Sequence, residues 1–236
     1  MTDPDINYNG LNYFDDLDHF WLEKAPSEVL KELKPHINLI QENFSNSEGL
    51  ATSFLAGEIE HEYFLDRKKM PVFLNYIRDV VERSDKSTNF IKRMSNNTAK
   101  ELRLDAIWIN FQQKYEYNPA HLHAGLYSWV LWYQIPFTFE EERQFSNKPP
   151  TRNSSHGEFH FLYLNPNNSH KISQVNPYID KTKEGYFALF PSHLLHVVYP
   201  FYSSNDYRIT ISGNIFGLDG MGNEIGLADD MGNPLY

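Results

Sequence analysis

The feature that most constrains the fold is a change in the hydrophobic period near residue 101 of this 236-residue chain. From Leu102 to Asn110, apolar residues largely alternate with polar ones, as in a strand with one buried face. Several short strands separated by loops rich in Asn, Pro and Ser predict an all-β sandwich, barrel or jelly roll. Further segments of this kind follow at 127–135, 158–164, 185–191, 196–202 and 207–216.

The first hundred residues have a different pattern, in which apolar residues recur at the helical period. Pro35 lies inside the first of these segments and should kink or break a helix there. The stretch 83–100 is polar and predicts a loop or a weak helix. The predicted helices cover 26–40, 50–65 and 70–81.

These patterns predict one domain with three parts. Residues 1–100 form a helical region that packs on one sheet of a β core at 101–218. Residues 219–236 form a tail in which Met-Gly-Asn occurs twice, at 221–223 and 231–233. Gly and Asn favour turns, and the ligand spacing of an EF-hand calcium loop is missing.

Composition excludes several classes of function. The chain contains no cysteine, so disulfides, thiolate metal sites and thiol nucleophiles are impossible. The net charge of −10 argues against a partner such as duplex nucleic acid. No apolar stretch approaches the ~20 residues that a membrane-spanning helix needs. The first residues include Asp3 and Asp5 and no apolar signal segment, so a cytoplasmic location is expected.

Histidines concentrate in the β-rich part, where seven of the ten lie between 121 and 196. In an extended strand, His121 and His123 would point to the same face, about 6–7 Å apart, and two such imidazoles can bind one metal ion. The alternative is a pair of polar residues on the wet face of a strand. His196 has apolar neighbours and should be buried, either as a metal ligand or as a core histidine with a hydrogen-bond partner.

A file of polar residues runs along one face of the strand predicted at 207–216. Arg208, Thr210, Ser212 and Asn214 alternate with aliphatic residues, so they share a face. The planar guanidinium of arginine suits bidentate binding of a carboxylate. The alternative is the solvent-exposed face of an amphipathic strand.

In their order along the chain, these motifs resemble those of the 2-oxoglutarate- and Fe(II)-dependent oxygenases, a family common in bacteriophage and marine bacterial genomes. The similarity spans roughly Ala106 to Phe216. It implies a mainly β, double-stranded β-helix (jelly-roll) core with a metal between its two sheets. It also implies a non-haem dioxygenase that uses Fe(II) and 2-oxoglutarate, hydroxylates a substrate, and releases succinate and CO2.

The resemblance also assigns metal ligands. His121 matches the first histidine of the family motif and His196 the distal one. The family's acidic ligand should stand at position 123, where this chain has His123. The simplest reading is a three-histidine site, although Glu116 or Glu158 could supply a carboxylate from elsewhere in the chain.

The co-substrate residues follow in the same way. Arg208 matches the basic residue that binds the far carboxylate of 2-oxoglutarate, with Thr210 at the hydroxyl position beside it. Asn110, on the preceding strand, is a further candidate contact to the co-substrate.

Two other functions remain open at this point. Three histidines also suit a zinc-dependent hydrolase or lyase on a jelly-roll fold, which would have no use for Arg208. A non-catalytic jelly-roll binding module would leave the histidines scattered. The sequence names neither the substrate, which can be a small molecule or a side chain, nor the oligomeric state.

Overall fold

The computed structural model describes residues 20–44, 49–145, 155–165 and 168–225, and two antiparallel sheets dominate it. The larger sheet has seven strands, and its strand β5 (Tyr127–Gln134) is buried almost throughout. The order across the larger sheet is β1 (Trp21–Lys24), β8 (Tyr186–Pro191), β5 (Tyr127–Gln134), β10 (Arg208–Leu218), β3 (Glu101–Gln112) and β2 (Glu62–Leu65), with β11 (Glu224–Ile225) paired to β10.

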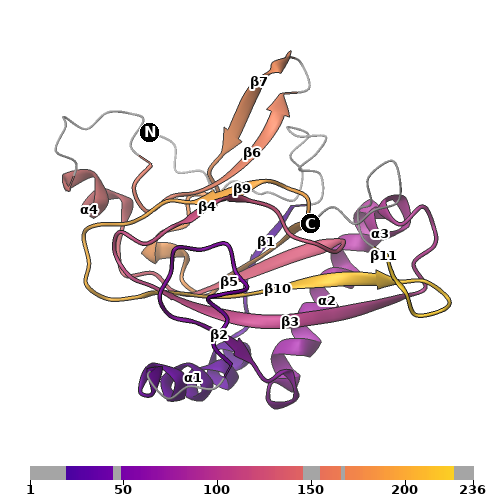
Figure 1. Cartoon of the computed structure of the whole chain (residues 1–236), viewed down its shortest axis with the longest axis horizontal. Coiled ribbons are helices and arrows are strands. Elements are labelled where there is room, and N and C mark those ends of the chain that lie inside the picture. Colours follow the sequence, from indigo (N-terminus) through magenta and orange to yellow (C-terminus); the bar gives the residue numbers. More distant parts are fainter. Residues whose placement is uncertain (1–19, 45–48, 146–154, 166–167, 226–236) are drawn as a thin grey trace.

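The smaller sheet has four strands and faces the larger one, with β6 and β7 extending away from the body of the molecule (Figure 1). Its order is β4 (Asn118–His121), β9 (His196–Val198), β6 (Phe159–Asn165) and β7 (Asn168–Val175). Apolar side chains of both sheets pack between them, including Trp132 and Phe190 from the larger sheet and Phe161 from the smaller. The predicted mainly β jelly-roll core is confirmed.

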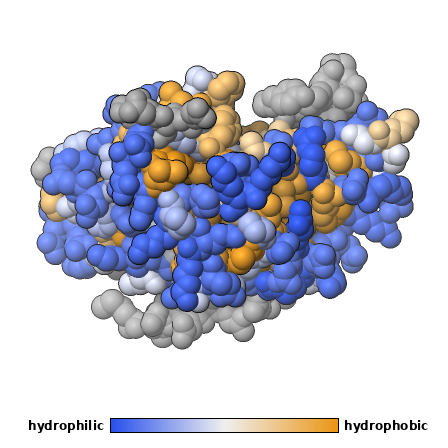
Figure 2. All heavy atoms as spheres, turned by 90° about the horizontal axis from the view of Figure 1, so that it is seen from below, coloured by the Kyte–Doolittle hydropathy of each residue, from blue (hydrophilic) through white to orange (hydrophobic). Residues whose placement is uncertain are grey.

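Helices cover the other face of the larger sheet. The main ones are α1 (Ser27–Gln41) and α2 (Pro71–Thr88), and both lie on the side of the sheet opposite β4 and β9 (Figure 1). Leu33 and Phe73 are fully buried against a core that includes Trp129 of β5. Viewed from the helical side, the surface is mainly hydrophilic with smaller hydrophobic areas (Figure 2). The shorter helical elements are α3 (Phe90–Met94), α4 (Phe139–Gln144), η2 (Arg67–Lys69) and η3 (Lys181–Lys183).

The helix predicted over 50–65 is wrong. This segment forms turns, and its last four residues are strand β2, which pairs with β3. A half-buried strand is favoured by Tyr63, Phe64 and Leu65. The neighbouring strand β3 provides hydrogen-bond partners for their backbone, so the segment pairs with the sheet instead of forming a helix.

Other local differences are smaller. Helix α1 continues through Pro35, and α2 and α3 occupy much of the segment 83–100 that was predicted as a loop or weak helix. The first Met-Gly-Asn forms a turn held by Asp219, whose carboxylate accepts hydrogen bonds from the backbone of Met221 and Asn223. The second, at 231–233, lies outside the described residues. No helix among the described residues is long and apolar enough to span a membrane.

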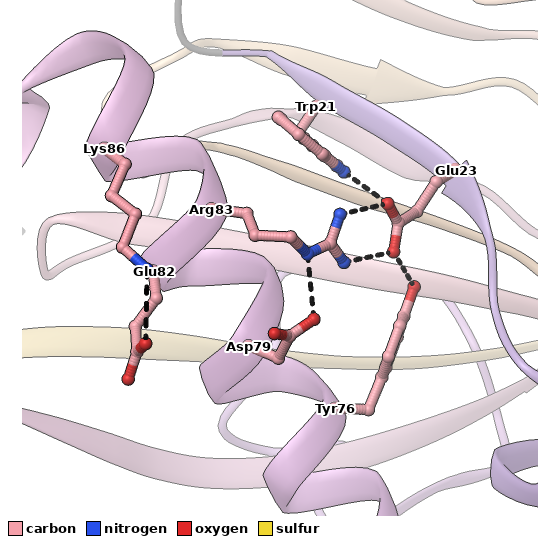
Figure 3. Close-up of polar contacts among 7 residues, drawn as sticks. All are labelled: Trp21, Glu23, Tyr76, Asp79, Glu82, Arg83 and Lys86. Carbon is pink, nitrogen blue, oxygen red and sulfur yellow. Dashed lines mark hydrogen bonds and ion pairs between the residues drawn. The ribbon is translucent and has the colours of Figure 1, made fainter.

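A polar cluster attaches the edge strand β1 to α2 (Figure 3). The Glu23 carboxylate accepts two hydrogen bonds of 2.8 Å from the Arg83 guanidinium, one of 2.8 Å from Trp21 and one of 3.0 Å from Tyr76. Arg83 also donates to Asp79. Burial alone would raise the pKa of Glu23, but these hydrogen bonds outweigh it and hold the pKa below its ordinary value.

We expect the substitution Glu23→Gln to lower the free energy of unfolding by about 1 kcal/mol, because the ion pair is charge-assisted but partly exposed. A carboxyl whose pKa is lowered by folding stabilises the fold above its unfolded pKa and loses that effect as pH falls through the folded pKa. The difference in the free energy of unfolding between wild type and variant, measured by urea denaturation, should therefore become smaller in acid. The matched control is Glu82→Gln, which removes an exposed ion pair with Lys86 on α2 and should change the free energy of unfolding little.

Candidate functional site

Three histidines meet between the two sheets. His121 of β4 stands opposite His196 of β9 in the antiparallel register, so the strand pairing itself brings these rings together. Strand β4 ends at His121, and His123 follows in the loop after it, where its backbone N–H donates to the Ser192 carbonyl at 2.9 Å. One potential ligand atom from each ring lies within 4.8 Å of the other two. The predicted convergence is therefore present, and the histidines are not scattered.

Backbone carbonyls orient two of the rings. The Nδ1 atom of His121 is 2.7 Å from the Pro119 carbonyl oxygen, and Nδ1 of His196 is 2.9 Å from that of Leu194. Because a carbonyl only accepts, each Nδ1 carries the proton and donates it. The lone pair is then on Nε2 of both rings, which is how metal-binding histidines are commonly held.

Burial keeps the three imidazoles neutral. It lowers the pKa of His123 to about 3, with the neighbouring His121 as the second cause. Burial also lowers the pKa of His121 and that of His196, where the other two rings contribute. A metal ion requires the neutral form of histidine, so this donor set suits a divalent transition metal at neutral pH.

The two carboxylates considered as substitute ligands have other partners. Glu116 accepts hydrogen bonds from the backbone N–H groups of Glu60, at 3.0 Å, and Gln113, at 2.6 Å. Glu158 is 2.6 Å from Nε2 of His160. The cluster itself contains only histidines among the residues that the structure describes.

A cavity of about 60 Å³ extends from the histidines towards the larger sheet. Arg208 and Thr210 of β10 and Asn110 of β3 line it, so the three predicted co-substrate residues share a cavity with the three histidines. Arg208, Thr210 and Ser212 of the polar file line the cavity, so this face of β10 points to the interior and not to solvent. Asn214, the fourth residue of the file, accepts a hydrogen bond from the Ser128 hydroxyl.

Arg208 is held rigidly at this wall. Its Nε and Nη2 donate to Oε1 of Gln112 at 2.9 and 2.7 Å, and the guanidinium also donates to the carbonyls of Gly157 and Tyr199. Burial lowers its pKa to about 9, an effect that the charge of Glu142 partly offsets. The side chain therefore stays cationic at neutral pH, and no ion pair in the described part of the chain includes it.

Sequence reasoning missed several polar residues of the cavity. Glu62, Gln112 and Asn118 line it. Glu62 was assigned to a helix, so its direction could not be predicted. The alternation on β3 offered a signal for Gln112, which lies two residues beyond Asn110 and hence on the same face.

Comparison with family models matches residues 106–214 to the family described as "Putative 2OG-Fe(II) oxygenase". A prolyl-4-hydroxylase from Pseudomonas putida has a similar structure, with a TM-score of 0.50 and 11% identity over 84% of this chain and 94% of that one. The viral collagen prolyl hydroxylase of Paramecium bursaria Chlorella virus-1, in its 2-oxoglutarate complex, gives 0.50 and 12% over 84% and 95%. These two likenesses concern the fold. No curated protein sequence matches the chain.

Proposed function

Because this chain belongs to the 2OG-Fe(II) oxygenase family through residues 106–214, we propose that His121, His123 and His196 hold its iron. The protein is a 2-oxoglutarate-dependent dioxygenase whose cofactors are Fe(II) and 2-oxoglutarate. The observation that carries the residue assignment is the convergence of three neutral imidazoles in a cavity that also holds a buried arginine.

The donor set supports an iron site with open positions. Three protein ligands leave room for a chelating co-substrate and for oxygen. A site made only of histidines carries one more positive charge than the usual two histidines and one carboxylate, and this favours a dianionic co-substrate. When bound, Fe(II) supplies the oxygen activation that no side chain can perform.

On the side of the larger sheet, we assign 2-oxoglutarate binding to Arg208, Thr210 and Asn110. Four of the five guanidinium N–H groups of Arg208 donate to neutral acceptors, which fix its plane and leave its charge for an anion. The Thr210 hydroxyl accepts from Nδ2 of Asn110 at 3.3 Å, so its own proton is available to a carboxylate. These groups would orient the co-substrate and exclude water around it.

We further propose that residues 1–100, 101–218 and 219–236 act as one domain. The supporting observation is a single core shared by α1, α2 and the larger sheet, to which the first hundred residues also contribute two strands. A cytoplasmic location is proposed because Fe(II) and 2-oxoglutarate are both available there.

The test is anaerobic reconstitution with Fe(II) followed by titration of 2-oxoglutarate, read by absorption spectroscopy, and then turnover in air, read as succinate. The expected result is one iron per chain, a spectral change that saturates with 2-oxoglutarate, and slow succinate release that substrates accelerate. Retention of zinc through chelation, with no spectral response to 2-oxoglutarate, would instead favour the zinc site and contradict these assignments.

A further inference from the structure

The cavity contains hydrogen-bond acceptors that 2-oxoglutarate cannot satisfy. Both carboxyl oxygens of Glu62, Oδ1 of Asn110 and Oδ1 of Asn118 are buried without a hydrogen-bond partner in the described chain. Since 2-oxoglutarate offers only acceptors, this acceptor-rich part of the wall calls for a different ligand, one that carries donors.

The position of Glu62 is set by the sheet and by the loop before it. Glu62 is only 1% exposed and pairs with Asn110 across β2 and β3. A β-carbon at Gly57 would lie 3.1 Å from Oε1 of Glu62 and closer still to Oδ1 of Asn118, so both acceptors approach the same point beside this glycine. The carboxyl group therefore lies in the cavity wall, beside the Asn118 amide and away from solvent.

A buried carboxyl group without a partner is costly. Burial, and secondarily the charge of Glu116, raises the pKa of Glu62 to about 8, so the group holds a proton at neutral pH. A cation that enters the cavity would replace this proton and form a charge-assisted pair in a desolvated site, which is the strongest interaction this wall can offer.

We propose that Glu62 is a specificity-determining residue that binds a protonated primary amine on the substrate to be hydroxylated, with Asn118 as a second acceptor. The three N–H donors of an alkylammonium group match the carboxylate and the amide oxygen beside it. This inference rests on the proposed function, because the assigned iron and 2-oxoglutarate sites share the cavity with Glu62.

The experiment uses n-butylammonium as the probe, with 1-butanol and butyrate as neutral and anionic analogues. Each is titrated by calorimetry into the full chain, both metal-free and loaded anaerobically with Fe(II) and 2-oxoglutarate. Wild type should bind butylammonium in preference to both analogues. Glu62→Gln should weaken that binding at least about tenfold. Glu60→Gln, which removes an exposed carboxylate two residues earlier, is the matched control and should bind as wild type does.

Proton release gives a second readout that a purely structural role would not change. Titrations at neutral pH in buffers of different ionisation enthalpy should show a proton leaving wild type when butylammonium binds, and none leaving Glu62→Gln. Thermal unfolding of both variants verifies that they are folded, as expected for substitutions that preserve the shape of the side chain.

The inference is overturned if wild type binds none of the probes, if 1-butanol binds as well as butylammonium, or if Glu62→Gln binds butylammonium unchanged. Failure of the proposed function looks different. In that case wild type would not bind 2-oxoglutarate, while the titration of butylammonium into the metal-free protein would still test the role of Glu62. We expect Glu62→Gln to bind 2-oxoglutarate as wild type does, which separates the test of the amine site from that of the 2-oxoglutarate site.

Discussion

Replacing His196 by alanine is expected to abolish metal retention and, with it, succinate formation. His196 is almost completely buried, and its Nδ1 is committed to the Leu194 carbonyl, so no other group can take the place of its Nε2. Loss of a partner outside the ligand shell already costs about 10–100-fold in metal affinity, and loss of a ligand should exceed that. The measurement is iron content after anaerobic reconstitution and desalting, together with a competition titration against a chelator.

The matched control is His193→Ala. His193 is exposed in the turn just before β9 and does not line the cavity, so this variant should retain iron as wild type does. If His196→Ala keeps a full equivalent of tightly bound iron, the assigned metal site is wrong.

Replacing Arg208 by alanine should leave iron bound but weaken 2-oxoglutarate binding by about 2–5 kcal/mol, the cost of removing one partner from a buried charge pair. Arg208→Lys should recover only part of the loss, because an ammonium group retains the charge but not the four hydrogen bonds that fix the guanidinium in the cavity wall. The measurement is the dissociation constant for 2-oxoglutarate in the anaerobic Fe(II) protein, taken from the spectral titration.

Because Arg208 also bonds to Gln112, Gly157 and Tyr199, its removal will cost stability, and thermal unfolding must show that the variants are folded at the assay temperature. Arg103→Ala is the control for a lost cation. Arg103 lies on β3 in an exposed ion pair with Glu224 and should not affect the co-substrate. An unchanged 2-oxoglutarate affinity in Arg208→Ala would show that the carboxylate binds elsewhere.

Much of the β core could be predicted because its signal is local. Alternation along 102–110 and 207–216 depends only on which residues face the core, and the structure places β3 and β10 there as neighbours. The same alternation correctly put Arg208 and Thr210 on one face. Strand β2 could not be predicted in this way, because four residues have no period of their own and form a strand only when a sheet edge is available.

The site shows the same division. The sequence alone determined the donor types, their order along the chain and the exclusion of thiolate ligands, since these follow from residue identity and spacing. Only the tertiary structure decided that His121 and His196 stand opposite each other, that Glu116 and Glu158 have other partners, and that Glu62 is left without one in the cavity. The physical reason is that burial and hydrogen-bond satisfaction depend on segments far apart in the chain, which no local pattern records.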